Sequence, residues 1–267
     1  MRKNLLKSLV AGAAILAASA SANAYVMNIG GTDYTFDSID WSSGGSAWST
    51  DYRDAAGNAG GVGHTFNLAI QSAAAALLLG NQTVYTFDAS SPFELTLFAT
   101  VNETVTLDIG GLQTFNLNYG SWSVYQDGAK NANLLTGVGI ADGTKVLGGT
   151  FDAGFSGSFT ASNPTSGFGS QGLPGAVDAA PNGLIDPHPA QTLAVTTLQM
   201  GSFLTAALPT GFSNGLADGG TNPLFNSSDI SQLVMQVDAN QRFVPEPASM
   251  ALLGLGMAGM AALRRRK

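Results

Sequence analysis

Cysteine is absent from this chain of 267 residues. Its absence excludes disulfides, thiolate metal sites, iron–sulfur clusters and cysteine nucleophiles. The two histidines, His64 and His188, do not form a spaced ligand group such as H-E-x-x-H, so a zinc site built on imidazoles is not expected. Without disulfides the fold depends on its core, and about 220 residues suffice, because a domain of that size buries roughly 70% of its unfolded surface.

Basic residues are also scarce between the two ends. Residues 25–243 contain four Lys or Arg side chains against seventeen Asp or Glu, a formal net charge of −13. A polyanion repels phosphate backbones and anionic lipid heads, so neither nucleic-acid binding nor peripheral membrane binding is expected. Low total charge and 34 glycines favour a turn-rich β protein.

The first 24 residues have the pattern of a secretory signal peptide. The basic start consists of Arg2, Lys3 and Lys7. An apolar run at 9–18 follows, and the small residues Ala22 and Ala24 suit a signal peptidase that would leave Tyr25 as the new N-terminus. An apolar run of about ten residues is too short for a membrane anchor, which needs about 20.

Three features follow one another at the C-terminus. The extended tripeptide Pro245, Glu246, Pro247 precedes sixteen uncharged residues, 248–263. Sixteen residues give roughly 24 Å of helix, which is just short of the thickness of a membrane's hydrocarbon core, about 30 Å. The basic stop consists of Arg264, Arg265, Arg266 and Lys267. Because cations resist translocation, we expect residues 25–243 outside and the basic tail in the cytoplasm.

Residues 244–267 closely resemble the PEP-CTERM sorting segment of Gram-negative bacteria. The resemblance rests on Pro245-Glu246-Pro247, the short glycine-bearing helix and the terminal arginine cluster. It implies that an exosortase, a membrane-embedded cysteine peptidase, removes the helix after transient anchoring in the inner membrane. The protein would then reach the cell surface or extracellular matrix. A tail anchor that is never processed would use the same helix and arginines but would not need the tripeptide.

Residues 25–243 are expected to form one all-β domain, an antiparallel β-sandwich. The clearest signal is 93–109, where apolar residues occupy the odd positions. Seventeen extended residues would reach about 56 Å, so a fold-back near Asn102-Glu103 is expected, followed by a tight turn at Gly110-Gly111. Leu97→Asp should therefore unfold the domain, and Thr96→Asp should be nearly neutral.

Other segments complete the predicted sandwich. Further strands are expected at 25–29, 34–36, 65–70, 83–87, 121–126, 145–151, 157–161, 193–203 and 232–237. One short helix is predicted at 71–79 from its alanine and leucine content. Residues 162–191 are expected to form a long surface loop.

No catalytic set is assembled by the recognisable motifs. Residues 211–215 match G-x-S-x-G, but both histidines precede Ser213, so the order of a Ser–acid–His hydrolase cannot be built. A glycosidase needs two carboxyl groups that face each other across a cleft. The two glutamates of residues 25–243, Glu94 and Glu103, both lie in the predicted hairpin at 93–109, so the sequence does not indicate such a pair. The expectation is a protein that is not an enzyme and has no cofactor.

An irregular calcium site is the open alternative to a protein without bound metal. Oxygen ligands could come from aspartates clustered at Asp33, Asp37 and Asp40 and at Asp51 and Asp54. Their alternative role is that of solvated turn residues.

Sugar contact is a second open possibility, because aromatic rings stack on sugars. The candidates are Tyr125, Trp41 and Trp48, with Trp122 expected in the core on strand parity. Three segments, 198–203, 227–230 and 237–240, are also similar to flocculation-associated PEP-CTERM proteins. That similarity implies a non-enzymatic surface protein that supports floc formation with exopolysaccharide. A secreted carbohydrate-active enzyme or a sugar-binding module is the alternative.

Overall fold

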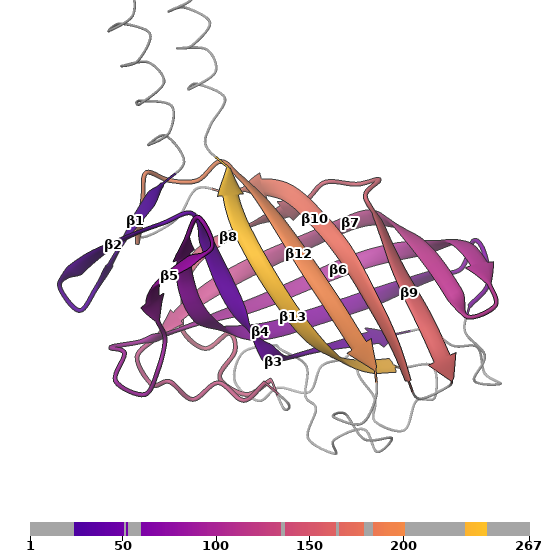
Figure 1. Cartoon of the computed structure of the whole chain (residues 1–267), viewed down its shortest axis with the longest axis horizontal. Coiled ribbons are helices and arrows are strands. Elements are labelled where there is room, and N and C mark those ends of the chain that lie inside the picture. Colours follow the sequence, from indigo (N-terminus) through magenta and orange to yellow (C-terminus); the bar gives the residue numbers. More distant parts are fainter. Residues whose placement is uncertain are drawn as a thin grey trace, which may run out of the picture.

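The computed structural model describes residues 24–50, 52, 60–134, 137–163, 166–178, 184–200 and 233–244. These residues form an all-β, antiparallel, sandwich-like fold, as predicted (Figure 1). The strands are β1 (Tyr25–Ile29), β2 (Thr32–Phe36), β3 (Ser38–Thr50), β4 (Thr65–Leu79), β5 (Gln82–Thr86), β6 (Glu94–Ile109), β7 (Leu112–Asp127), β8 (Thr144–Phe151), β9 (Ser156–Asn163), β10 (Ser166–Val177), β11 (Ile185–Asp186), β12 (Gln191–Met200) and β13 (Leu233–Val244). Within these ranges no helix has the length and apolar character needed to cross a membrane.

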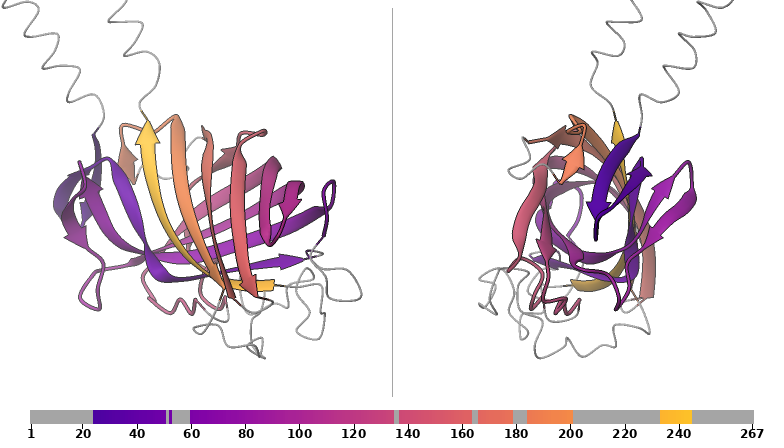
Figure 2. Two further views of the ribbon diagram at one scale, coloured as in Figure 1. Left: turned by 45° about the vertical axis from the view of Figure 1, so that its right-hand side comes forward. Right: turned by 90° about the vertical axis from the view of Figure 1, so that its left-hand side faces the viewer.

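The large sheet closes on itself. Hydrogen-bonded neighbours run in the order β12, β13, β3, β4, β6, β7, β8 and β10, and β10 pairs again with β12. The short strands β8 and β9 lie one after the other between β7 and β10. Figure 2 shows the strands wrapped around one interior, with the small sheet β11-β1-β2 at one end. Strands on opposite sides therefore face each other across a shared core.

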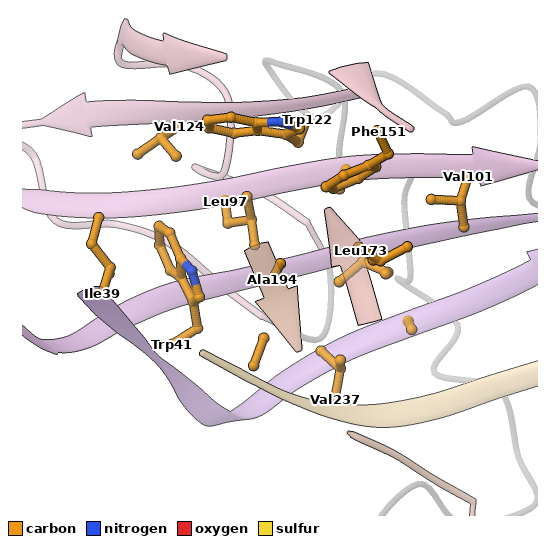
Figure 3. Packing of buried hydrophobic residues seen from close by; sticks show 14 of the residues in the cluster. Ile39, Trp41, Leu97, Val101, Trp122, Val124, Phe151, Leu173, Ala194 and Val237 are labelled. Carbon is orange, nitrogen blue, oxygen red and sulfur yellow. The ribbon is translucent and has the colours of Figure 1, made fainter. Parts of the chain in front are cut away.

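The core fills this interior with large apolar side chains. Trp41, Leu97 and Trp122 point into it from β3, β6 and β7 (Figure 3). Each fully buried side chain of this size stabilises the fold by roughly 1.5–3 kcal/mol. The burial of Trp122 confirms the prediction made from its strand parity.

Strand β6 corrects the predicted hairpin. The prediction that the odd positions of this segment face the interior is confirmed. The buried residues are Leu95, Leu97, Ala99, Val101 and Val105. The predicted fold-back at Asn102-Glu103 is wrong, because β6 continues unbroken to Ile109 and pairs with β7 along its length. Pairing with β7 along the strand, and with β4 from Thr96 to Thr104, supports a strand of 16 residues. The reversal comes at Gly110-Gly111, as predicted, where both residues have positive φ, 58° and 89°.

Two other expectations about local structure are wrong. Residues 71–79, predicted as a helix, belong to β4, which pairs with β3, β5 and β6. Sheet pairing outweighs the intrinsic helix propensity of alanine and leucine, which amounts to tenths of a kcal/mol per residue. Residues 162–191, expected as a surface loop, contain β10, which pairs with β12 over ten residues.

Glu103 is an acid enclosed in the interior. Its side chain is 1% exposed and lines a cavity of about 20 Å³ together with Ser49, Tyr52 and apolar residues. Loss of hydration raises the pKa of Glu103 to about 7, and the nearby amide of Gln171 opposes the shift. Among the described residues, Oε1 of Glu103 and Nε2 of Gln171 have no hydrogen-bond partner of normal geometry. The fold therefore favours the neutral carboxyl.

Replacing Glu103 by Gln should remove a pH dependence of stability. Between the ordinary pKa of 4.5 and the folded value of about 7, the unfolded chain loses the proton first, so the free energy of unfolding falls as pH rises. The full loss is about 3 kcal/mol. The measurement is urea unfolding of both proteins from about pH 4 to about pH 8. The free energy of unfolding of Glu103→Gln, relative to that of the wild type, should increase as pH rises through this window. Asp108→Asn, at the exposed end of β6, is the control. A difference between wild type and Glu103→Gln that does not vary with pH would contradict the assignment.

Substitutions in β6 should separate its inner and outer faces. Leu97→Asp places an unpaired charge in the core and should cost several kcal/mol. The expectation that Thr96→Asp is neutral is wrong, because Thr96 is fully buried and its Oγ1 donates to the Ile140 carbonyl. We now expect Thr96→Asp to destabilise as well. Thr106→Asp, at an exposed position of the same strand, should change the urea midpoint little. A large loss from Thr106→Asp would show that the burial pattern of β6 is incorrect.

Candidate functional site

The first and last strands of the domain meet at one end of the fold. Tyr25 opens β1, and Phe243 is the penultimate residue of β13. Their ring centroids lie 5.7 Å apart, and Phe36 of β2 lies 6.2 Å from Tyr25 and 6.1 Å from Phe243. All three rings are buried, and the two pairs that include Phe243 are edge-to-face, an arrangement that contributes about 0.5–1.5 kcal/mol per pair. We call Tyr25, Phe36 and Phe243 the aromatic clamp.

Strand β13 is held firmly up to its last residue. Val244 pairs with Gln191 of β12, and Arg242 pairs with Ser38 of β3. The Phe243 amide donates to the Asp37 carbonyl at 3.0 Å. Within the described residues, strand pairing thus extends to Val244.

Asp37 organises the polar surroundings of the clamp. Its carboxylate accepts hydrogen bonds from the Gly80 amide at 3.1 Å and from Ser38 Oγ at 2.9 Å. Arg242 Nη2 lies 3.7 Å from Asp37 Oδ2, but the arginine side chain is 61% exposed, so this ion pair contributes little. The hydrogen bonds tie the start of β3 to the end of β4.

The extent of β13 could have been found in the sequence. A strand was expected at 232–237, whereas the structure continues it to Val244. Val237, Ala239, Gln241 and Phe243 are buried at alternate positions, which is the period of a strand with one buried face.

The predicted sugar-contact tryptophans are not exposed rings. Trp41 and Trp48 are each 1% exposed, which corrects their selection as stacking platforms. Trp41 belongs to the core, because it is large and apolar and lies on the inner face of β3. Tyr125 is half-buried on β7, between Thr96 and Lys145 of the neighbouring strands.

Strand β7 also carries an exposed aromatic ring that was not predicted as a sugar contact. Tyr119 is 65% exposed and lines a hollow of about 160 Å³ on the outer face of the sheet. The sequence does not show the orientation of Tyr119, because the apolar residues of 112–119 have mixed parity: Leu112 is at an even position, and Phe115 and Leu117 are at odd positions. A register shift between β6 and β7 at Asn102/Glu103 is the cause of that mixed parity.

The aspartates suggested for calcium have separate surroundings. Asp33 is exposed and accepts from Asn28, and Asp37 contacts Arg242, Gly80 and Ser38. Partial burial, and then the nearby negative charge of Asp238, raise the pKa of Asp40. Asp51 and Asp54 lie outside the described residues. Within the described ranges, no group of three or more acidic or histidine side chains could hold a metal ion.

The two glutamates of the domain lie in different environments of one strand. Glu103 is enclosed in the interior, whereas Glu94 is half-buried at the start of β6, where its Oε1 accepts from the Ala132 amide at 3.0 Å. Desolvation raises the pKa of Glu94, as do Asp127 and Asp142, while amide donors oppose the rise. Glu94 and Glu103 are therefore not a pair of carboxyl groups facing each other across a cleft.

Several predicted site residues lie outside the described residues. They are Ala22 at the predicted signal-peptide cleavage site, the tripeptide Pro245, Glu246, Pro247, the basic stop Arg264, Arg265, Arg266, Lys267, and the G-x-S-x-G stretch at 211–215.

Comparison with known proteins bears on the C-terminal segment. No curated protein and no solved structure matches the chain. Residues 243–267 match the family model of the PEP-CTERM protein-sorting motif. The match begins at Phe243, the buried residue of the aromatic clamp, and continues through Pro245-Glu246-Pro247 to the basic end. This motif marks an exported protein that is anchored transiently in the membrane before cleavage by an exosortase. The chain therefore carries a PEP-CTERM protein-sorting motif, which begins within the last two residues of β13, the last strand of its folded domain.

Proposed function

We propose that this protein acts at the cell surface or in the extracellular matrix of a Gram-negative bacterium, where it supports cell aggregation together with exopolysaccharide. The observation that carries the proposal is the sorting motif at 243–267, which begins at the end of the last strand of a folded β domain. Its role is that of a non-enzymatic adhesive component. Placement outside the cell is then the central step in its function.

Processing at both ends would yield the mature domain. Signal peptidase cuts after Ala24, and Tyr25 then opens β1 inside the aromatic clamp. The exosortase acts beyond Val244, because residues up to Val244 are paired in the sheet and a peptidase needs an extended, unpaired chain. The product keeps β13 and loses the sorting helix.

The charge of the domain restricts how it can hold cells together. Two surfaces that each carry a net charge of −13 over residues 25–243 repel each other. Adhesion therefore depends on a bridging polymer or on divalent cations rather than on direct charge attraction. Exopolysaccharide is the bridging partner that we propose.

Deleting residues 245–267 should abolish aggregation while the folded domain is still made. Without the sorting segment the protein is exported but not retained for transfer to the surface. Settling of cell suspensions measures the effect, and circular dichroism of the secreted product checks the fold. Cells that clump normally with the truncated chain, or with the gene deleted, would contradict the proposed function.

A matched variant separates sorting from anchoring. Replacing Pro245, Glu246 and Pro247 by alanines keeps the apolar stretch and the basic stop, so the chain should remain anchored and unprocessed in the membrane fraction. Normal release of this variant would show that the tripeptide is not needed.

Mass spectrometry of surface or matrix protein should find the two new ends. We expect an N-terminal peptide that begins at Tyr25 and C-terminal peptides that include Val244 and end before Arg264. Peptides that run from Phe243 through Arg264 in the mature extracellular pool would show that no processing occurs. A mature extracellular pool in which no peptide contains Phe243 and Val244 would contradict the protection of β13.

A further inference from the structure

The outer face of β3, β4, β6 and β7 carries an uncharged hollow. These four strands lie side by side in the sheet (Figure 1). The hollow has a volume of about 160 Å³ and is lined by Trp48, Asn67, Ala69, Thr100 and Tyr119, among others. It could hold about five water molecules at roughly 30 Å³ each, or one sugar ring in their place.

Strand register explains why the sheet is hollowed here. Trp48 pairs with Ala69, Ala69 with Thr100, and Thr100 with Ser121, so these residues form a row across four strands. Ala69 has the smallest side chain of the row and lies between the indole and the threonine. The buried Trp48 ring packs at 6.3 Å from Phe98 in the neighbouring row. The hollow is thus a fixed feature of the sheet rather than of a loop.

A network of amides and hydroxyls borders the hollow on one side. Asn102 donates to Asn67 Oδ1 at 2.9 Å, and Asn118 donates to Asn102 Oδ1 and to Thr104 Oγ1, each at 2.8 Å. Thr100 and Ser121 share a hydrogen bond of 3.3 Å. Because a hydroxyl has one donor and two acceptor sites, Thr100 and Ser121 keep further capacity for a ligand. The polar groups are held in place before any ligand arrives.

Tyr119 supplies the open aromatic surface. It pairs with Asn102 across β6 and β7, next to the amide network, and is 65% exposed. An aromatic face beside neutral donors and acceptors suits a ring that has apolar C–H faces and hydroxyl edges. No charged residue occurs in the row of Trp48, Ala69, Thr100 and Ser121, or in the adjoining row of Asn67, Asn102 and Tyr119. A charged ligand would find no counter-ion in these rows.

We propose that this hollow binds an uncharged polysaccharide, with one sugar ring stacked on Tyr119 and its hydroxyls hydrogen-bonded by Thr100, Ser121 and the Asn67–Asn102–Asn118 network. The proposal rests on the proposed surface function and names the class of polymer that it would bind. Neutral sugar is favoured over acidic sugar because the domain is a polyanion, which repels carboxylated or sulfated chains. Binding through hydrogen bonds and stacking also avoids dependence on ionic strength.

Affinity electrophoresis of the full chain tests the site. The chain is run in a detergent without a sugar headgroup, through gels that contain dextran, amylose, glucomannan or galactomannan, and through gels that contain alginate. We expect at least one neutral polymer to retard the chain and alginate to have no effect. Tyr119→Ala should weaken the retardation about tenfold, as expected from the loss of one aromatic contact. Tyr119→Phe, which keeps the ring, should retain most of the binding.

Two further variants complete the test: one fills the hollow, and the other is a control at a distant aromatic residue. Ala69→Leu places a larger side chain in the hollow and should also weaken binding. Phe168→Ala removes an aromatic ring that is 61% exposed on β10 and should leave binding unchanged. If Ala69→Leu does not fold by circular dichroism, Tyr119→Ala decides alone, because Tyr119 is not part of the core.

The outcomes separate this proposal from the proposed function. No retardation by any of the four neutral polymers, stronger retardation by alginate, or unchanged binding of Tyr119→Ala would overturn the sugar site. Each of these results leaves the aggregation experiment with the truncated chain to decide the adhesive function by itself. Retardation by a neutral polymer that Tyr119→Ala loses and Phe168→Ala keeps would establish the site.

Discussion

Closure of the large sheet is the constraint on which the rest of this structure depends. Each strand in the path from β12 through β13, β3, β4, β6, β7, β8 and β10 has a hydrogen-bonded neighbour on both sides. The pairing satisfies backbone groups that would otherwise be exposed at an edge and available to other chains. It also allows β6 and β7 to run for 16 residues each. A chain without cysteine is thus held by backbone pairing and one enclosed core.

Closure has a consequence for the chemistry of the interior and for the ends of the domain. Glu103 lies at an inward position and is 1% exposed, and this burial raises the pKa of its carboxyl and favours the neutral form. A strand in the middle of the path cannot be removed without breaking pairs on both sides. For β13, these are the pairs with β12 and β3, which extend along the strand as far as Val244.

The sequence predicted those features that depend on local pattern. The inner face of β6 followed from its alternating residues, and the sorting segment could be recognised because its parts follow one another along the chain. The fold-back in β6 and the helix at 71–79 were wrong because strand length and local propensity were applied without knowledge of the neighbouring strands. The exposure of Tyr119 could not be predicted, because it depends on a register shift between two strands. Trp48 was misjudged for a similar reason, since its burial depends on tertiary neighbours.

The ring contact between Tyr25 and Phe243 brings the two ends of the folded domain to one place. A tether at either terminus would leave the molecule from the same spot and present the same outer surfaces to the medium. A lipid anchor engineered at the N-terminus would therefore display the domain in the orientation that a C-terminal linkage gives. Joining the two ends by a short peptide would yield a circular chain with little rearrangement of the strands.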